Sequence, residues 1–248
     1  MAFPERIRQL VHAAVWVQRH VRGKLSDADA TQAAVLLGPS DIFLDVGAHS
    51  GTWTVALSTF LPEGHVYSIE ALPYYANVLR LTLSLLRRPN VTVLNRAVNA
   101  TGEQVSLVWK NADGQRLAGL THMASEEELA EADVTVPGLR LDTLLATIGD
   151  GRVRLIKMDI EGAELLGLRG AQTILETHQP ALYLEAFASY TVRYGYELPE
   201  LFTFLEDLSY RAFQARYGEQ PTPISASAYS GKGDLWFLTD EDAKLLTC

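Results

Sequence analysis

The sequence predicts an α/β protein with a mostly parallel sheet and helices on both of its faces. Two observations lead to this class. Short apolar runs alternate with helical stretches from residue 41 onward, as in chains built from repeated strand-helix-strand units. The chain has 248 residues, of which 48% are hydrophobic, so one large core can be buried. We expect seven strands, the last of them antiparallel, near residues 42–46, 65–69, 91–95, 153–158, 181–186, 210–215 and 234–238.

The first strand leads into a turn that contains two glycines. Residues 42–54 read Ile-Phe-Leu-Asp-Val-Gly-Ala-His-Ser-Gly-Thr-Trp-Thr, an apolar strand followed by the start of a helix. Asp45, Gly47 and Gly51 then lie at the carboxyl edge of the sheet, where glycine lets the backbone approach a ligand. We expect a helix over 52–61 with Ser50 as its N-cap, and its free N–H groups would point at that ligand.

The second strand ends in an acidic residue. Glu70 lies 19 residues beyond Gly51, about the spacing at which a strand-end carboxylate accepts hydrogen bonds from both hydroxyls of a ribose. The pattern Asp-x-Gly-x-x-x-Gly differs from the Gly-x-Gly-x-x-Gly of dinucleotide sites, because it places a carboxylate before the first glycine. That anion would repel a pyrophosphate, but it suits the cationic amino-acid end of S-adenosylmethionine. The pattern therefore favours S-adenosylmethionine as the cofactor.

Two later strands add polar residues to the same edge of the sheet. A third strand, 91–94, is followed by Asn-Arg-Ala-Val at 95–98, the place where such folds contact an adenine ring. A fourth strand, 153–158, is followed by Asp159 and Glu161 and by a glycine that opens another helix.

Together these motifs closely resemble the FkbM family of S-adenosylmethionine-dependent methyltransferases. They are Asp-Val-Gly-Ala-x-x-Gly at 45–51, Glu70, and Lys-x-Asp-Ile-Glu-Gly-Ala-Glu-Leu at 157–165 followed by Leu-Arg-Gly-Ala at 168–171. The resemblance covers about residues 41–187. It implies a Rossmann-like class I methyltransferase core and methylation of a hydroxyl group on a small molecule, such as a sugar, a polyketide or another secondary metabolite, which could be carrier-bound. The chain departs from the family at His49, where asparagine is usual.

On this basis the chain divides into an N-terminal helical extension, residues 1–40, and an S-adenosylmethionine-dependent methyltransferase domain, residues 41–248. The residues expected to bind the cofactor follow the ends of the first four strands: Asp45, Gly47, Ala48, His49, Ser50, Gly51, Thr52, Glu70, Ala71, Arg96, Ala97 and Asp159.

Methylation of a hydroxyl group needs a positioned acceptor oxygen and gains roughly 10²–10⁴-fold from a base that takes its proton. Asp159 and Glu161 are candidates for that base, since alternate residues of an extended strand face the same way. Glu185, after the strand at 181–184, is a third candidate, and His122 is a fourth. The three carboxylates could instead hold Mg²⁺, because hard cations favour oxygen ligands. The sequence does not require a metal, and we assign no metal ligand.

Residues 1–24 combine helical spacing with basic charge. Five basic residues against one acidic residue give this segment a net charge of +4. Apolar residues recur at helical intervals, at Ile7, Leu10, Val11, Ala14 and Val15. We expect a helix packed on the core, and the alternatives are contact with a membrane surface or with an acidic carrier protein. The apolar stretch is too short for a transmembrane segment, and its charges do not fit a signal peptide.

Two polar segments are expected to form loops at the ligand end of the sheet. Residues 111–133 contain glycines and acidic residues, so we expect an exposed loop or a short helix that could close over the site as a lid. His122 lies there, as a solvated loop histidine or as a site residue. Residues 217–233 form the second expected loop.

Charge and cysteine content limit the binding partners and the cellular compartment that we expect. The whole chain carries −9, so residues 25–248 carry −13, and a surface of this sign repels a nucleic-acid backbone. Cys248 is the single cysteine, which excludes a disulfide framework and fits a reducing cytoplasm. A homo-oligomer is left open.

Two other classes of function are alternatives to a methyltransferase. A nicotinamide-dependent oxidoreductase would need the third glycine that this pattern lacks. A non-catalytic S-adenosylmethionine-binding or carrier-docking protein of a biosynthetic complex would keep the binding motifs without turnover.

Overall fold

The central sheet has eight strands among the residues that the structure, a computed structural model, describes, namely 4–25, 27–110, 121–125, 128–215 and 217–246. Their order is β12-β11-β13-β10-β9-β1-β2-β3. The bounds are β1 Ile42–Val46, β2 His65–Ile69, β3 Val91–Leu94, β9 Val153–Met158, β10 Ala181–Glu185, β11 Arg211–Gln214, β12 Thr222–Pro223 and β13 Asp234–Leu238. The seven expected strands are confirmed. The eighth, β12, is a two-residue edge strand within the segment expected to be a loop.

The strand directions mark where a ligand can bind. β3, β2, β1, β9 and β10 are parallel, whereas β13 pairs antiparallel with both β10 and β11, so the last strand is antiparallel as expected. The chain runs from β1 outward to β3 and then returns to β9 on the other side of β1. This reversal between β1 and β9 is a topological switch point, and open α/β sheets bind ligands beyond the carboxyl ends of the strands at such points.

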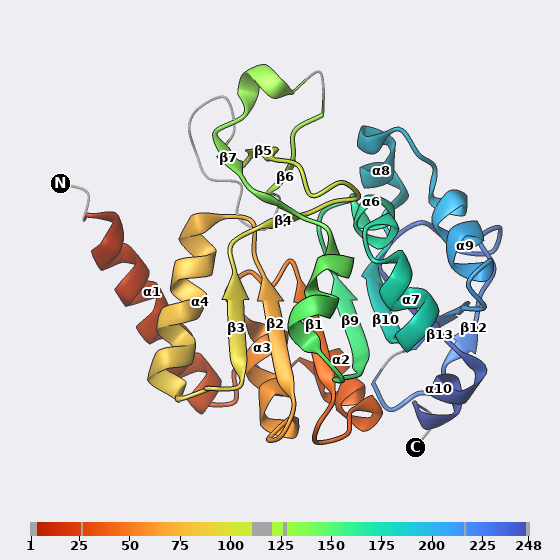
Figure 1. The fold of residues 1–248 in the computed structure, drawn as a ribbon, viewed down its shortest axis with the longest axis horizontal. Helices are drawn as coiled ribbons and strands as arrows, with labels where there is room; N and C mark the ends of the chain where they lie inside the picture. The colour runs from red at the N-terminus through yellow and green to blue at the C-terminus, as the bar shows by residue number, and fades with distance from the viewer. Residues whose placement is uncertain (1–3, 26, 111–120, 126–127, 216, 247–248) are drawn as a thin grey trace.

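Helices cover both faces of the sheet (Figure 1). Ile42 and Leu44 of β1 pack into a cluster on one face, whereas Phe43 packs with Trp53 and Leu57 on the other face. Because both faces are buried, the parallel strands read as nearly continuous apolar runs. The helices are α1 Glu5–Val21, α2 Ala28–Ala33, α3 Thr52–Leu57, α4 Pro73–Leu86, α5 Leu145–Ile148, α6 Glu164–Arg169, α7 Gln172–His178, α8 Ala188–Thr191, α9 Leu198–Glu206 and α10 Asp240–Leu245, with 3₁₀ turns η1 Ala34–Leu36, η2 Ser58–Phe60, η3 Leu129–Glu131, η4 Leu141–Leu144 and η5 Val192–Tyr194.

The start of α3 differs from the expectation. The N-cap position is Gly51, in a left-handed conformation at φ 90°, so the expectation that Ser50 caps this helix is wrong. The reason is that the Asp45 carboxylate accepts from the backbone N–H of Thr54, at 3.0 Å, and so takes the role of the cap. A Cβ on Gly51 would lie 2.3 Å from Cδ1 of Leu79, which indicates that this glycine serves the packing of α3 on α4. The helix is also shorter than expected, because η2 follows its end at Leu57.

A small second sheet lies beyond the carboxyl ends of the central strands (Figure 1). In it, β5 Val105–Val108 pairs antiparallel with β6 His122–Met123 and β7 Val134–Val136. At the base of this insertion β4 Ala97–Val98 pairs with β8 Gly138–Leu139. Residues 111–120 and 126–127 of the expected lid lie outside the described residues. Its described part contains β6 and η3, and His122 is buried, so a solvated loop histidine is the wrong interpretation.

α1 packs along α4, as expected of a helix on the core, but with a different face from the apolar one. Gln9 and Ala13 are its buried residues. The apolar residues that set its helical spacing, including Leu10 and Val11, remain exposed. Among the described residues, no helix is long and apolar enough to cross a membrane.

Candidate active site

A cavity lies at the switch point, between the ends of β1, β2 and β9 and the small covering sheet. Its volume is about 210 Å³. Nine residues that the sequence analysis assigned to the cofactor or to catalysis line it: Gly47, His49, Glu70, Ala71, Arg96, Ala97, His122, Asp159 and Glu161.

Gly47 allows β1 and β9 to approach each other where they enter the cavity. Its φ is +75°, and a Cβ at this position would lie 1.8 Å from the carbonyl oxygen of Asp159. No side chain fits in that space. Glycine is therefore needed here both for its backbone conformation and for the contact with the neighbouring strand end.

Glu70 presents a buried carboxylate to the cavity. One oxygen accepts a hydrogen bond from the backbone N–H of His49 and the other from that of Leu72, each at 2.7 Å. Burial raises the pKa of Glu70 to about 7, although the two N–H groups favour its charged form. Each carboxylate oxygen has a further lone pair. The residue can therefore accept two more hydrogen bonds, as a ribose requires.

Asp45 faces a second cavity, which shares Gly47, His49 and Asp159 with the first and is lined by several more carboxylates. Oδ2 of Asp45 is held by the backbone N–H and the hydroxyl group of Thr54. Burial raises the pKa of Asp45. Besides these shared residues, three of the residues expected at the cofactor line this second cavity and not the first: Asp45, Ala48 and Thr52.

Lys157 connects the two strand ends. Its Nζ donates to the carbonyl oxygen of Gly47 at 2.9 Å and lies 3.2 Å from Oδ2 of Asp159 and 3.9 Å from Oδ1 of Asp45. Burial acts to lower the pKa of Lys157, but the carboxylates of Asp159 and Asp45 outweigh it, and the pKa is raised. The ammonium group therefore stays charged and fixes the glycine turn to the acidic end of β9.

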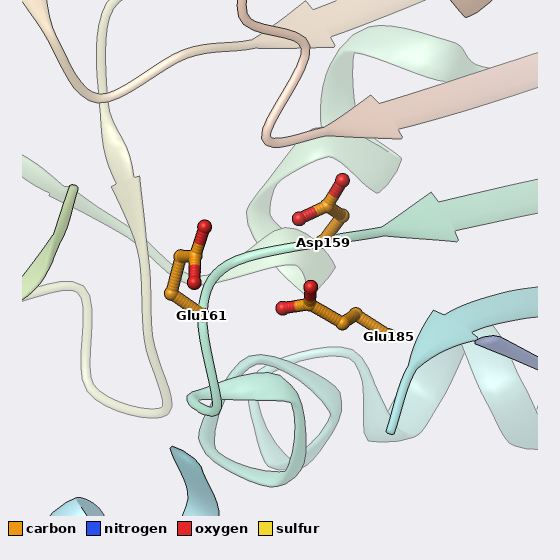
Figure 2. Close-up of side chains that lie close together, drawn as sticks. All are labelled: Asp159, Glu161 and Glu185. Carbon is orange, nitrogen blue, oxygen red and sulfur yellow. The ribbon is translucent and has the colours of Figure 1, made fainter. Parts of the chain in front are cut away.

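Asp159, Glu161 and Glu185 form an acidic cluster, in which one oxygen of each lies within 4.8 Å of the others. Figure 2 shows Asp159 and Glu185 at the ends of their strands and Glu161 on the loop that follows β9. β9 ends at Met158, and Glu161 has φ +59°, so the expectation of an extended strand through these residues is wrong. A turn, and not strand alternation, brings Asp159 and Glu161 to the same cavity.

The acidic cluster holds protons at neutral pH. Burial, and next the charge of Asp159, raise the pKa of Glu161 to about 7 and that of Glu185 to about 9. Oε2 of Glu185 is buried and makes no hydrogen bond in the described part of the chain. Glu161, with a pKa of about 7, is partly ionised at neutral pH, and in that form it can accept a proton from a bound hydroxyl group. The three oxygen donors of the cluster also suit Mg²⁺, although the Lys157 ammonium already supplies one positive charge beside Asp159.

His122 lies across the cavity from β9, on the covering sheet. Its Nε2 is 3.2 Å from Oε1 of Glu128, and Nε of Arg193 lies 3.6 Å from the same oxygen. A carboxylate in this position orients the imidazole ring. His122 is therefore a buried, oriented histidine that faces the cavity.

His49 contributes a neutral ring. It lies against Tyr75, with ring centroids 3.8 Å apart, and Trp16 of α1 is 6.5 Å away. Burial, and next His12, lower the pKa of His49 to about 4. The imidazole is thus uncharged at neutral pH and can donate or accept one hydrogen bond per nitrogen.

Some expected residues line neither cavity, namely Ser50, Gly51 and Glu185. In turn, the sequence analysis assigned no role to Tyr75, Lys157 or Tyr183, which do line them. A role for Lys157 could have been predicted from the sequence, because this residue begins the Lys-x-Asp-x-Glu motif. Tyr75 and Tyr183 carry no local signal, because a helix residue and a buried strand residue of this kind are ordinary core residues.

An open, mostly parallel sheet with a cavity at its switch point and a strand-end carboxylate inside it defines a class I methyltransferase. The Methyltransferase FkbM domain family matches residues 45–212. The chain belongs to the FkbM family of S-adenosylmethionine-dependent methyltransferases, as its motifs predict.

Two solved structures of methyltransferases are similar to this chain. Methyltransferase FkbM from Methylobacillus flagellatus KT is 18% identical, with a TM-score of 0.50 over 81% of this chain and 44% of that protein. This chain therefore spans less than half of that relative. A SAM dependent methyltransferase from Aquifex aeolicus is 16% identical, with a TM-score of 0.47 over 87% of this chain and 90% of that one. No curated protein matches the chain.

Proposed function

We propose that this protein is an O-methyltransferase that acts on a hydroxyl group of a small molecule. The observation that carries this proposal is that one cavity contains both Glu70, a carboxylate suited to a ribose, and the acidic residues Asp159 and Glu161. A binding carboxylate and a candidate base so placed are what a hydroxyl acceptor beside a nucleoside cofactor requires.

The residues around Glu70 fit S-adenosylmethionine. This cofactor, when bound, supplies a methyl group on a positively charged sulfur. Glu70 would accept the ribose hydroxyls, and Ala71, Arg96 and Ala97 would line the place of the adenine ring. The second cavity, with Asp45 and several further carboxylates, suits a cationic amino group.

Glu161 is the best candidate for the base. It lines the cavity, and its pKa of about 7 means that it can take a proton at neutral pH. Asp159 is held by the Lys157 ammonium at 3.2 Å, so its charge is already neutralised locally. His122, held by Glu128 on the covering sheet, is the second candidate. In this scheme the acceptor hydroxyl loses its proton to Glu161 while its oxygen is methylated.

A divalent cation is the alternative role for the acidic cluster. Its carboxylates would then lower the pKa of a bound hydroxyl group by holding Mg²⁺ beside it. The close oxygen atoms of Asp159, Glu161 and Glu185 favour this alternative specifically.

The test is turnover of a panel of sugars and polyketide alcohols, followed as S-adenosylhomocysteine formed. Glu161→Gln keeps the shape of the side chain and removes the base, so we expect a loss of about 10²–10⁴-fold in turnover with cofactor affinity nearly unchanged. Glu63→Gln, at an exposed carboxylate outside both cavities, is the matched control.

Three results would change the proposal. Full turnover by Glu161→Gln removes this residue as the base and moves the role to His122. Activity that disappears with a chelator and returns with Mg²⁺ supports the cation. Tight cofactor binding without turnover of any hydroxyl acceptor would instead support a non-catalytic binding or carrier-docking protein.

A further inference from the structure

α1 exposes its aliphatic residues to solvent. Ile7, Leu10, Val11, Val15 and Val21 are between 43% and 73% exposed. Residues three and four apart lie on one side of a helix. Ile7, Leu10, Val11 and Val15 therefore form a continuous stripe, which the exposed Gln18 separates from Val21; we call these five aliphatic side chains the aliphatic face. Scattered apolar residues are normal on a surface, but a continuous stripe of them marks an interaction site.

The opposite side of α1 holds the helix in this orientation. Gln9 and Ala13 are buried, and the His12 ring lies 6.0 Å from those of Tyr74 and Tyr75 on α4. Further along, Trp16 meets His49, as described above. The polar and aromatic side of α1 is thus its packing side. The aliphatic face cannot turn inward without breaking these contacts.

Basic residues border the aliphatic face, while the rest of the chain is acidic. Arg6, Arg8, Arg19 and Arg22 are exposed on or just after α1, and residues 1–24 carry +4 against −13 for the remainder. At 100° per residue, Arg8 and Arg19 lie to one side of the stripe and Arg6 to the other, and Arg22 follows the end of the helix. A negatively charged surface would therefore meet positive charge on both borders of an apolar stripe.

We propose that α1 binds the surface of an anionic lipid membrane, with its aliphatic face in the acyl boundary and its arginines at the lipid phosphates. An interfacial helix has these features: apolar side chains on one face, arginine or lysine beside them, and no need to span the bilayer. α1 has 17 residues and is about 25 Å long at 1.5 Å per residue, so it lies in the membrane plane.

The chemistry of the face favours lipid over protein. Protein interfaces gain most of their affinity from tryptophan, tyrosine and arginine in pockets, and leucine and valine are under-represented among such residues. The aliphatic face offers only isoleucine, leucine and valine. A second copy of this chain placed on the same face would bring its arginines against those of the first, which is unfavourable. This inference does not depend on the methyl-transfer chemistry.

Sedimentation with vesicles tests the proposal. We expect the full chain to bind vesicles of equal parts phosphatidylcholine and phosphatidylglycerol and not vesicles of phosphatidylcholine alone. The variant Leu10→Gln with Val11→Gln should partition about 100-fold more weakly, at roughly 10-fold for each aliphatic side chain. Arg8→Gln and Arg22→Gln should each weaken vesicle binding about 5-fold, and added salt should also weaken it.

The matched control is Val192→Gln in η5, which follows α8 on the far side of the molecule from α1 (Figure 1). Val192 is 64% exposed, so it matches the exposure of the residues on α1, and its substitution should leave vesicle binding unchanged. Because every substituted side chain is exposed, the melting temperatures should agree with that of the unsubstituted chain. If the double variant does not fold, the two arginine variants still test the charge requirement.

Four outcomes would overturn the proposal. The first is no binding to anionic vesicles, and the second is equal binding to neutral ones. The third is a dimer of the unsubstituted chain that Leu10→Gln with Val11→Gln converts to a monomer, since the occupant would then be a second copy. The fourth is a preference for an acidic carrier protein over anionic vesicles.

Discussion

At the scale of single residues, Glu70 is the residue that we propose binds the ribose of the cofactor. Two backbone N–H groups hold its carboxylate, so its position is fixed before any ligand arrives. Removing it by Glu70→Ala should weaken S-adenosylhomocysteine binding about 10- to 150-fold, because a hydrogen bond to a charged group contributes roughly 1.5–3 kcal/mol. Titration calorimetry measures this affinity.

The control for that experiment is Glu63→Ala, which removes an exposed carboxylate that lines neither cavity. Its affinity should equal that of the unsubstituted protein. If Glu70→Ala folds and binds as tightly as the control, then Glu70 does not contact the ribose.

The residues that the sequence could identify are those in short motifs at strand ends. Gly47, Glu70 and Asp159 were found in this way, because the strand, turn and helix that place them are close in the chain. Residues such as Tyr75 and Trp16 could not be found, since α4 and α1 reach His49 only through tertiary packing.

At the scale of elements, the contact between the ends of β1 and β9 depends on Gly47. Gly47→Ala should destabilise the fold by more than the roughly 1–2 kcal/mol that a left-handed conformation costs a non-glycine residue, because its Cβ would also meet the Asp159 carbonyl at 1.8 Å. Gly195→Ala is the matched control: its φ is +72°, and a Cβ there meets nothing within 4 Å. Denaturant unfolding of both variants separates the cost of the left-handed conformation from the cost of the clash with the Asp159 carbonyl.

Equal losses of unfolding free energy in Gly47→Ala and Gly195→Ala would show that the strand ends can separate without penalty. We expect instead that Gly47→Ala alone also weakens cofactor binding, since the Lys157 hydrogen bond to the Gly47 carbonyl would shift with the backbone.

The sequence predicted long apolar elements better than short ones. All seven expected strands are present, and the central ones, such as β1 and β9, are mostly apolar runs buried on both faces. β6 and β12 have two residues each and owe their existence to pairing with β5 and β11, which no local pattern signals. The sequence also could not predict which side of α1 packs on the core, because aromatic rings of α4 contact the polar side of this helix.

At the scale of the whole molecule, buried carboxyl groups should make stability depend on pH. Burial raises the pKa of Glu70 and Glu161 to about 7, of Glu164 to about 8 and of Glu185 to about 9, from an ordinary 4.5. Between pH 4.5 and the raised pKa of each group, the folded chain holds a proton that the unfolded chain has released. The stability that these groups contribute is therefore greatest below pH 4.5, and it is lost as the pH rises from there through 7 to 9.

Urea unfolding at a series of pH values, with a chelator present, measures this dependence. Glu185→Gln removes the group with the highest of these pKa values, so the decrease in unfolding free energy toward pH 9 should be smaller in this variant. A stability that rises between pH 6 and pH 9 would contradict the assignment of protons to these carboxyl groups.

The covering sheet enters and leaves the core at neighbouring points, because β4 and β8 pair side by side at its base. An insertion whose two ends already meet can change in length or sequence with little effect on the strands below, since closing a longer loop costs only about 0.6 kcal/mol for each doubling. The side of the cavity that we propose for the cofactor belongs to the central sheet, and the opposite wall belongs to this insertion. Acceptor preference could therefore be exchanged between relatives by grafting residues 99–137 as one cassette, with the nucleoside-binding half of the enzyme left intact.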